Sequence, residues 1–250
     1  MLRFFRQIRQ RLLADNKINK YFLYALGEIL LVVIGILIAL QINNWNEERK
    51  QNHLETVYLN RLHNELKKDI STFSNEIQRL ESNNEKIVGF TNVLKDENYN
   101  DSLLVELTKA YMTYGTSYPI FNPSTSTFED LSSTGNLSVI SNTEMRDRII
   151  KHYEDYQFVE LNFKQNYDWA TPIDAPLYTH TDALKFDTEY TSFLFPKASE
   201  QNLAKEIIKD KTIFLRNAAI HFWMNKDGLI QLKRIKDETS LICATLEKKE

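Results

Sequence analysis

One uninterrupted apolar stretch near the N-terminus constrains this chain more than any other feature. Residues 29–40 read ILLVVIGILIAL, inside a longer segment, 21–42, whose only charged residue is Glu28. A helix rises about 1.5 Å per residue, so this segment spans roughly 33 Å, enough to cross a hydrocarbon core of about 30 Å. We therefore expect one transmembrane helix at residues 21–42.

The charges on the two sides of this segment predict its orientation. Six basic residues and one acid precede it, whereas two acids and two bases follow it directly. Basic flanks stay in the cytoplasm, which predicts a basic cytoplasmic arm (1–20), the transmembrane helix (21–42) and an exported domain (43–250). The whole chain carries −3, and without the +5 arm and Glu28 the exported part carries −7, which does not suit binding to nucleic acid.

A cleaved signal peptide would share the basic start and the apolar centre. The stretch before the apolar run is long, and the residues that follow the run, Leu40-Gln41-Ile42-Asn43, make a poor cleavage site. Both observations favour an uncleaved signal anchor.

The first residues carry an amphipathic pattern. On a helical wheel, aromatic and aliphatic side chains share one arc and arginines the opposite arc: Phe4, Phe5, Ile8 and Leu12 against Arg3, Arg6 and Arg9. A short basic helix of this kind can lie on the anionic inner leaflet. A solvated topology signal without a fixed structure accounts for the same charges equally well.

One face of the predicted transmembrane helix suggests helix packing. Glu28, Gly35 and Ala39 fall within about 40° of each other at 100° per residue. Gly35-x-x-x-Ala39 is a pair of small residues that lets another helix approach, and the Glu28 carboxyl can hydrogen-bond there. The alternative is an acid that reaches the headgroups or stays protonated, beside small residues present by chance.

The exported domain has the pattern of an all-α protein, and we expect an elaborated four-helix bundle. From Ile36 to Val88 there is neither Gly nor Pro, and apolar residues recur every seven positions, in a series broken only at Asn52: Trp45, Leu59, Leu66, Phe73, Leu80, Ile87 and Leu94. This pattern predicts a long helix with a narrow apolar stripe that ends near residues 95–101. Asp69 and Glu76 occupy intermediate positions, which favours packing within its own domain over a dimeric coiled coil.

Capping and breaking residues predict where the remaining helices begin and end. Asp101 would cap a helix over 102–114, and Ser126 with Glu129 would form a capping box for a short helix that Gly135 stops. Ser141 with Glu144 would open a helix that ends near residue 170, before Pro172. Residues 171–200 read as irregular, and a last helical region, with a kink or turn at 226–228, starts near Ser199.

Motifs for chemistry are missing from the sequence. The five histidines form no metal-ligand motif, and there is no nucleophile elbow, phosphate-binding loop or dinucleotide fingerprint. We therefore predict no catalytic residues, no cofactor and no metal site, and we expect the single cysteine, Cys243, to be a buried small side chain. The Ser/Thr cluster at 124–141 is interpreted as helix caps and turns rather than a nucleophile.

Two aromatic groups are weaker candidates for a ligand site. One has helical spacing typical of core: Tyr153, Tyr156, Phe163, Tyr167 and Trp169. The other, in the loop 178–195, is the better candidate because loops carry function: Tyr178, Phe186, Tyr190, Phe193 and Phe195.

The opening of the chain resembles a family of uncharacterised Bacteroidota proteins, known as a domain of unknown function of about this length. The resemblance lies in Phe4-Phe5-Arg6, Ile8-Arg9, Leu12-Leu13, Tyr24 to Ile29 and Val33 to Asn46, within the first 50 residues. It implies a Gram-negative inner membrane and a periplasmic C-terminal part, and it implies no activity.

These observations favour a non-enzymatic membrane protein that presents a periplasmic helical bundle to a protein partner, including another copy of itself. The lipid bilayer is the other expected partner. One alternative is a single-span subunit of an ion-driven or transport complex that uses Glu28. The layout resembles such subunits, although their compact α/β periplasmic domain has no counterpart in this helical tail. A second alternative is a periplasmic ligand sensor that signals through a partner, since the arm is too short for an output domain.

Overall fold

The computed structural model describes residues 18–247, and all regular structure within that range is helical. The chain divides into two compact units, Met1–Val57 and Tyr58–Glu250, and the first helix, α2 (Ile18–Lys95), contributes to both. The second is called the bundle unit here. The predicted all-α class is confirmed.

The part of α2 that belongs to the first unit exposes its apolar side chains all round. Ile29, Leu37 and Ile42 are among those that are more than half exposed, and Trp45 is 64% exposed. This helix is long and apolar enough to cross a membrane, which is weak support for the predicted span because a signal sequence has the same properties.

In the bundle unit, the seven-residue stripe becomes core. Leu66, Phe73, Leu80, Ile87 and Leu94 are each at most 2% exposed. The long helix therefore buries the face that its sequence pattern predicts, and it ends at Lys95, as expected.

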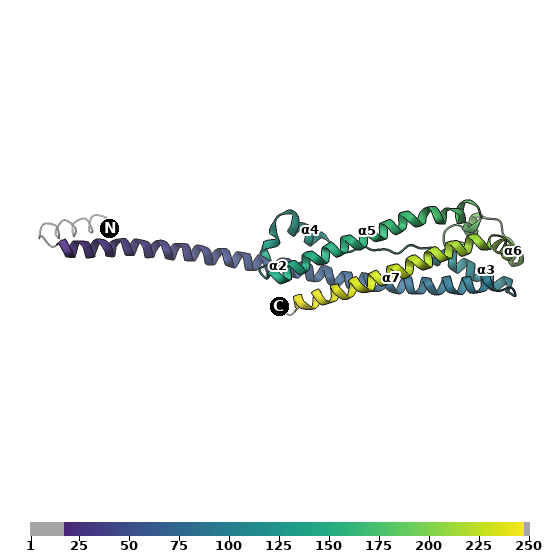
Figure 1. Ribbon diagram of the computed structural model, residues 1–250, viewed down its shortest axis with the longest axis horizontal. Helices are drawn as coiled ribbons and strands as arrows, with labels where there is room; N and C mark the ends of the chain where they lie inside the picture. The colour runs from purple at the N-terminus through teal and green to yellow at the C-terminus, as the bar shows by residue number, and fades with distance from the viewer. Residues whose placement is uncertain (1–17, 248–250) are drawn as a thin grey trace. The chain divides into compact units, whose positions relative to one another are not determined.

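In the bundle unit, the later part of α2 packs against α5 and α7, and shorter elements complete the bundle (Figure 1). After α2, the chain returns through α3 (Asp101–Ala110), a π-helical turn η1 (Tyr111–Gly115), an extended segment at 116–125, and α4 (Ser126–Ser133). A 3-10 turn, η2 (Asn136–Val139), leads into α5 (Thr143–Thr179). Two more 3-10 turns, η3 (Ala183–Phe186) and η4 (Ser192–Leu194), then α6 (Glu200–Lys209) and α7 (Lys211–Glu247), complete the unit. Helices α5 and α7 pack antiparallel, because Asn166 contacts Asp227 and Asn162 contacts Gln231.

Carboxylates of α2 explain how an extended segment can replace a helix in the bundle. The backbone N–H groups of residues 120, 124 and 127 have no helical acceptor, and each donates to an acid on α2: Glu76, Asp69 and Glu65, respectively. A buried N–H without an acceptor would cost about 1–3 kcal/mol. The acids at intermediate stripe positions are therefore acceptors for this segment.

Three predicted helix starts were wrong in their capping residues. Asn100 and Asn142, rather than Asp101 and Ser141, accept the capping hydrogen bonds of α3 and α5. Ser126 does not form a capping box, because its hydroxyl donates to Glu65 at 2.6 Å. Some hydroxyl groups of the Ser/Thr cluster therefore donate hydrogen bonds to carboxylates of α2 instead of capping a helix. The last helical region does start near Ser199, as predicted, and the Ser199 side chain caps α6. Gly135, with φ of 73°, follows α4.

Two predicted helix interruptions were also wrong. Helix α5 continues past residue 170 to Thr179, with Pro172 and Pro176 inside it. Each proline removes one N–H donor, yet the last turns still bury Asp174 and Leu177 against the rest of the bundle. Helix α7 passes straight through 226–228, where a Cβ on Gly228 would lie 3.1 Å from Pro119. That glycine allows close approach of the extended segment rather than a turn.

Candidate functional site

The predicted packing face of the transmembrane segment lies on α2 in the first unit. Helical geometry keeps Glu28, Gly35 and Ala39 on one side, and a Cβ on Gly35 would meet nothing within 4 Å. There is therefore room for another helix at Gly35, and docking on this face stays a prediction. The predicted membrane-surface residues of the arm lie outside the described residues: Arg3, Phe4, Phe5, Arg6, Ile8, Arg9 and Leu12.

A buried polar network around Asp174 joins several parts of the bundle. The Asp174 carboxylate accepts hydrogen bonds from the hydroxyl of Tyr118 and, at 2.8 Å, from the Asn217 amide, whose oxygen in turn accepts from Tyr111. His221 is fully buried, and its Nε2 lies 3.0 Å from Asp174 Oδ2, at ion-pair distance but without hydrogen-bond geometry. Burial raises the pKa of both tyrosines, so they stay neutral donors.

A second network is centred on Asp69 of α2. Its carboxylate accepts from the backbone and hydroxyl of Ser124 and from the hydroxyl of Tyr156, which also contacts Thr239 at 3.2 Å. Burial raises the pKa of Asp69, while its hydrogen bonds with Ser124 and Tyr156 act in the opposite direction. Beside this network, burial lowers the pKa of His152 to about 4. The networks connect helices and the extended segment to each other.

Sequence reasoning missed both networks. Asp174 stands between two prolines, which led to the interpretation of that stretch as a loop. The spacing of Asn217 and His221, four residues apart on the last helix, was the one available signal, because it places both side chains on one face.

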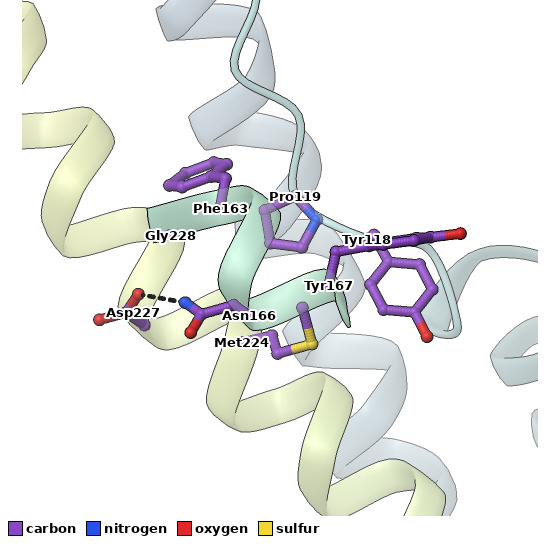
Figure 2. Close-up of a pocket in the computed structure, with 8 residues that line it drawn as sticks. All are labelled: Tyr118, Pro119, Phe163, Asn166, Tyr167, Met224, Asp227 and Gly228. Carbon is purple, nitrogen blue, oxygen red and sulfur yellow. Dashed lines mark hydrogen bonds between the residues drawn. The ribbon is translucent and has the colours of Figure 1, made fainter. Parts of the chain in front are cut away.

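A small pocket lies between the extended segment, α5 and α7 (Figure 2). Two residues of the predicted aromatic stripe, Phe163 and Tyr167, line it with Pro119, and Asn166 donates to Asp227 at 3.0 Å beside it. The space inside is about 10 Å³, which holds about one water molecule. It is therefore too small for an organic substrate.

The predicted aromatic groups divide between core and surface. Tyr153 and Tyr156 are buried, as helical spacing predicts for core, whereas Trp169 is 53% exposed. In the loop after α5, Phe186 belongs to the core, and Phe193 is 79% exposed. Neither group forms a ligand cleft in the described part of the chain.

An exposed apolar strip follows the seam between α5 and α7. Trp169 of α5 and Trp223 of α7 meet edge to face with ring centroids 5.4 Å apart, and each is about half exposed. Helical spacing places further exposed apolar side chains on the same sides of the two helices. The contacting pair Trp169 and Trp223 is called the Trp face here, and Phe158, Ile173 and Ile230 are exposed apolar side chains at matching helical positions.

Cys243 is buried, as predicted, and burial raises the pKa of its thiol. A thiol of this kind is a poor nucleophile at neutral pH because the thiolate is the reactive form. It does lie close to two other side chains that can bind metals, His63 and Glu247.

Over residues 18–247, the fold is a helical bundle together with one helix long and apolar enough to cross a membrane. The chain belongs to a family of unknown function (DUF6090), whose model matches residues 28–171, more than half of its length. The prediction of an uncharacterised family is thereby confirmed. The match begins at residue 28, so it covers only the later part of the region that carries the resemblance, and it continues to residue 171. Neither a curated protein nor a solved structure matches the chain.

Proposed function

We propose that this chain is a non-enzymatic, single-pass inner-membrane protein of a Gram-negative cell. Its N-terminus is cytoplasmic, and its helical bundle is periplasmic and binds a protein partner through the Trp face. The basic arm, the apolar helix and the near-neutral outer flank support this orientation.

The Trp face is the observation that carries the binding proposal. Tryptophans are enriched among the residues that dominate protein interfaces, and clustered apolar side chains on a surface mark interaction sites. Half of an indole is on the order of 100 Å² of surface, so covering that much stabilises a complex by about 2.5 kcal/mol. Two such rings in contact supply the centre of an interface.

The interior of the bundle supports binding over catalysis. The buried carboxylates Asp69 and Asp174 are engaged with donors from neighbouring segments. The pocket beside Pro119 admits about one water molecule. Catalysis by these carboxylates would need a space beside them that is large enough for a substrate.

The test is co-purification of the full-length chain from crosslinked native membranes. We expect Trp169→Ala with Trp223→Ala to reduce the captured partner at least tenfold without loss of the bundle, because both side chains are half exposed. Phe193→Ala, at an exposed aromatic residue of the loop, is the matched control and should capture as much as the unmodified chain.

Two tagged versions of the chain in one cell show whether the partner is a second copy. Capture of one version by the other, lost in the double tryptophan variant, identifies self-association through this face. A partner captured equally by the double variant would contradict the proposal.

A further inference from the structure

Three side chains with metal-binding atoms meet where the end of α7 packs against α2. His63 comes from α2, and Cys243 and Glu247 are one turn apart on α7. Their donor atoms all lie within 4.8 Å of one another, and His63 Nε2 is 3.2 Å from Glu247 Oε1. His63 is far from Cys243 and Glu247 in the sequence, so a spacing motif could not reveal the group.

The donor set and its geometry suit a zinc ion. Zinc binds thiolate, imidazole and carboxylate in a tetrahedron with bonds of about 2.0–2.3 Å, which places neighbouring donors roughly 3.4–3.7 Å apart. The His63–Glu247 pair is already close to this spacing, and the remaining donors need movements of about 1 Å or less. A thiolate and a carboxylate also neutralise the double positive charge of the ion.

The exposed fraction of the three side chains increases from Cys243 to Glu247, which leaves one side of the group open to an ion from solvent. Cys243 is 6% exposed, the His63 side chain is 13% exposed, and the Glu247 side chain is 54% exposed. The ion can therefore enter from the Glu247 side, and a water molecule can take the fourth position there. A structural role for Cys243 as a filler, with a surface pair between His63 and Glu247, is the competing explanation.

We propose that His63, Cys243 and Glu247 form a binding site for one Zn²⁺ that clamps the last turns of α7 to α2. On binding, the ion displaces the proton of the Cys243 thiol, which is released to solvent, and no electron is transferred. The clamp joins the last described turn of the chain to the helix that begins the bundle. This site is independent of the Trp face.

The test uses the full-length chain in detergent, with any tag removed and with metal stripped by a chelator. Zinc chloride alone is titrated in competition with a chromophoric chelator. We expect one zinc per chain with a dissociation constant below about 1 μM, and at least tenfold weaker binding in Cys243→Ala, His63→Gln and Glu247→Gln. His53→Gln and His180→Gln, at two exposed histidines, are controls and should bind as the unmodified chain does.

Cobalt substitution identifies the thiolate ligand directly. Co²⁺ should produce a thiolate-to-metal charge-transfer band in the unmodified chain and none in Cys243→Ala. Glu247→Gln changes a residue whose side chain is 54% exposed and should keep the fold, so its loss of affinity separates lost binding from unfolding. Absence of saturable zinc binding, or equal affinity in the three variants, would overturn the proposal.

Discussion

The two parts of α2 differ in how they distribute apolar side chains, although they belong to one continuous helix. Before residue 45, apolar side chains surround the helix, and those described are mostly about half exposed or more. After residue 58, they form a stripe whose central members, from Leu66 to Leu94, are almost fully buried. The first part is suited to a lipid environment on all sides, and the second to a bundle on one side and water on the other.

This difference shows that hydrophobicity and periodicity carry separate information. An apolar run without a polar face predicts a membrane as the surroundings of a helix, whereas a seven-residue stripe predicts protein. The second part of α2 also carries the acids Glu65, Asp69 and Glu76, which accept hydrogen bonds from a segment of the same bundle. These acids are a further sign that protein surrounds this part of the helix.

The largest effect is expected for a charge on the buried stripe. Leu66→Asp or Phe73→Asp should lower the free energy of unfolding of the bundle by more than about 4 kcal/mol, since each would bury an unpaired carboxylate. Urea unfolding of a soluble chain that begins at Asn52, followed by circular dichroism, measures this. Val88→Asp, at a partly exposed position of the same helix, should change it by less than about 0.5 kcal/mol. Unchanged unfolding of Leu66→Asp would show that the stripe is not core.

A smaller loss is expected when the network around Asp174 is opened. Asp174→Ala removes the acceptor of Tyr118 and Asn217 and the neighbour of His221, which should cost about 3 kcal/mol. The same unfolding measurement applies. Asp168→Ala, which breaks an exposed ion pair with Lys164, is the control and should cost less than about 1 kcal/mol. Equal effects of the two substitutions would mean that the network contributes little.

The stripe could be predicted from sequence, whereas the networks could not, and the reason is physical. Positions seven apart along a helix face the same side whatever surrounds them. The spacing of the apolar residues from Leu66 to Leu94 is therefore enough to predict that they are buried. The roles of Asp69 and Asp174 depend on Ser124, Tyr118 and Asn217, which only the fold brings near. The prolines of α5 show the same limit, because tertiary packing maintains a helix where local propensity is poor.

Acid should destabilise the bundle through His152. Burial holds its pKa at about 4, below the usual 6.5, so the stability that comes from keeping it neutral is complete above pH 6.5 and is lost as pH falls toward 4. Between pH 7 and pH 5 the loss should be about 2 kcal/mol. Asp155 and Arg148 also face this imidazole, with opposite effects on its pKa.

Variants of two histidines isolate this contribution in urea unfolding at the two pH values. His152→Gln should flatten the pH dependence, and His180→Gln, at an exposed histidine, should leave it unchanged. The raised pKa of Asp69 acts in the other direction, because its contribution falls as pH rises, and it is present in all the chains compared. A pH dependence that survives in His152→Gln would exclude this histidine as its source.

The smallest effect is expected in the apolar first part of α2, which is predicted to cross the membrane. If the face with Glu28 and Ala39 docks another helix, Gly35→Leu should weaken association by about 1 kcal/mol because it blocks close approach. Gly27→Leu is the matched control, because it also has open space around it but lies on a different side of the helix. Crosslinking in native membranes measures this, and equal association of both variants would leave the helix as an anchor only. In the alternative of an ion-driven subunit, Glu28→Gln would abolish function while association persists.

The most direct test of the account is the side of the membrane on which the bundle lies. Reporters fused after residue 60 and after residue 250 of the full chain, one type active only outside the cytoplasm and one only inside, read this in living cells. The account predicts activity of the outside reporter at both positions, from a membrane fraction that alkaline washing does not strip. Activity of the inside reporter at either position would contradict it.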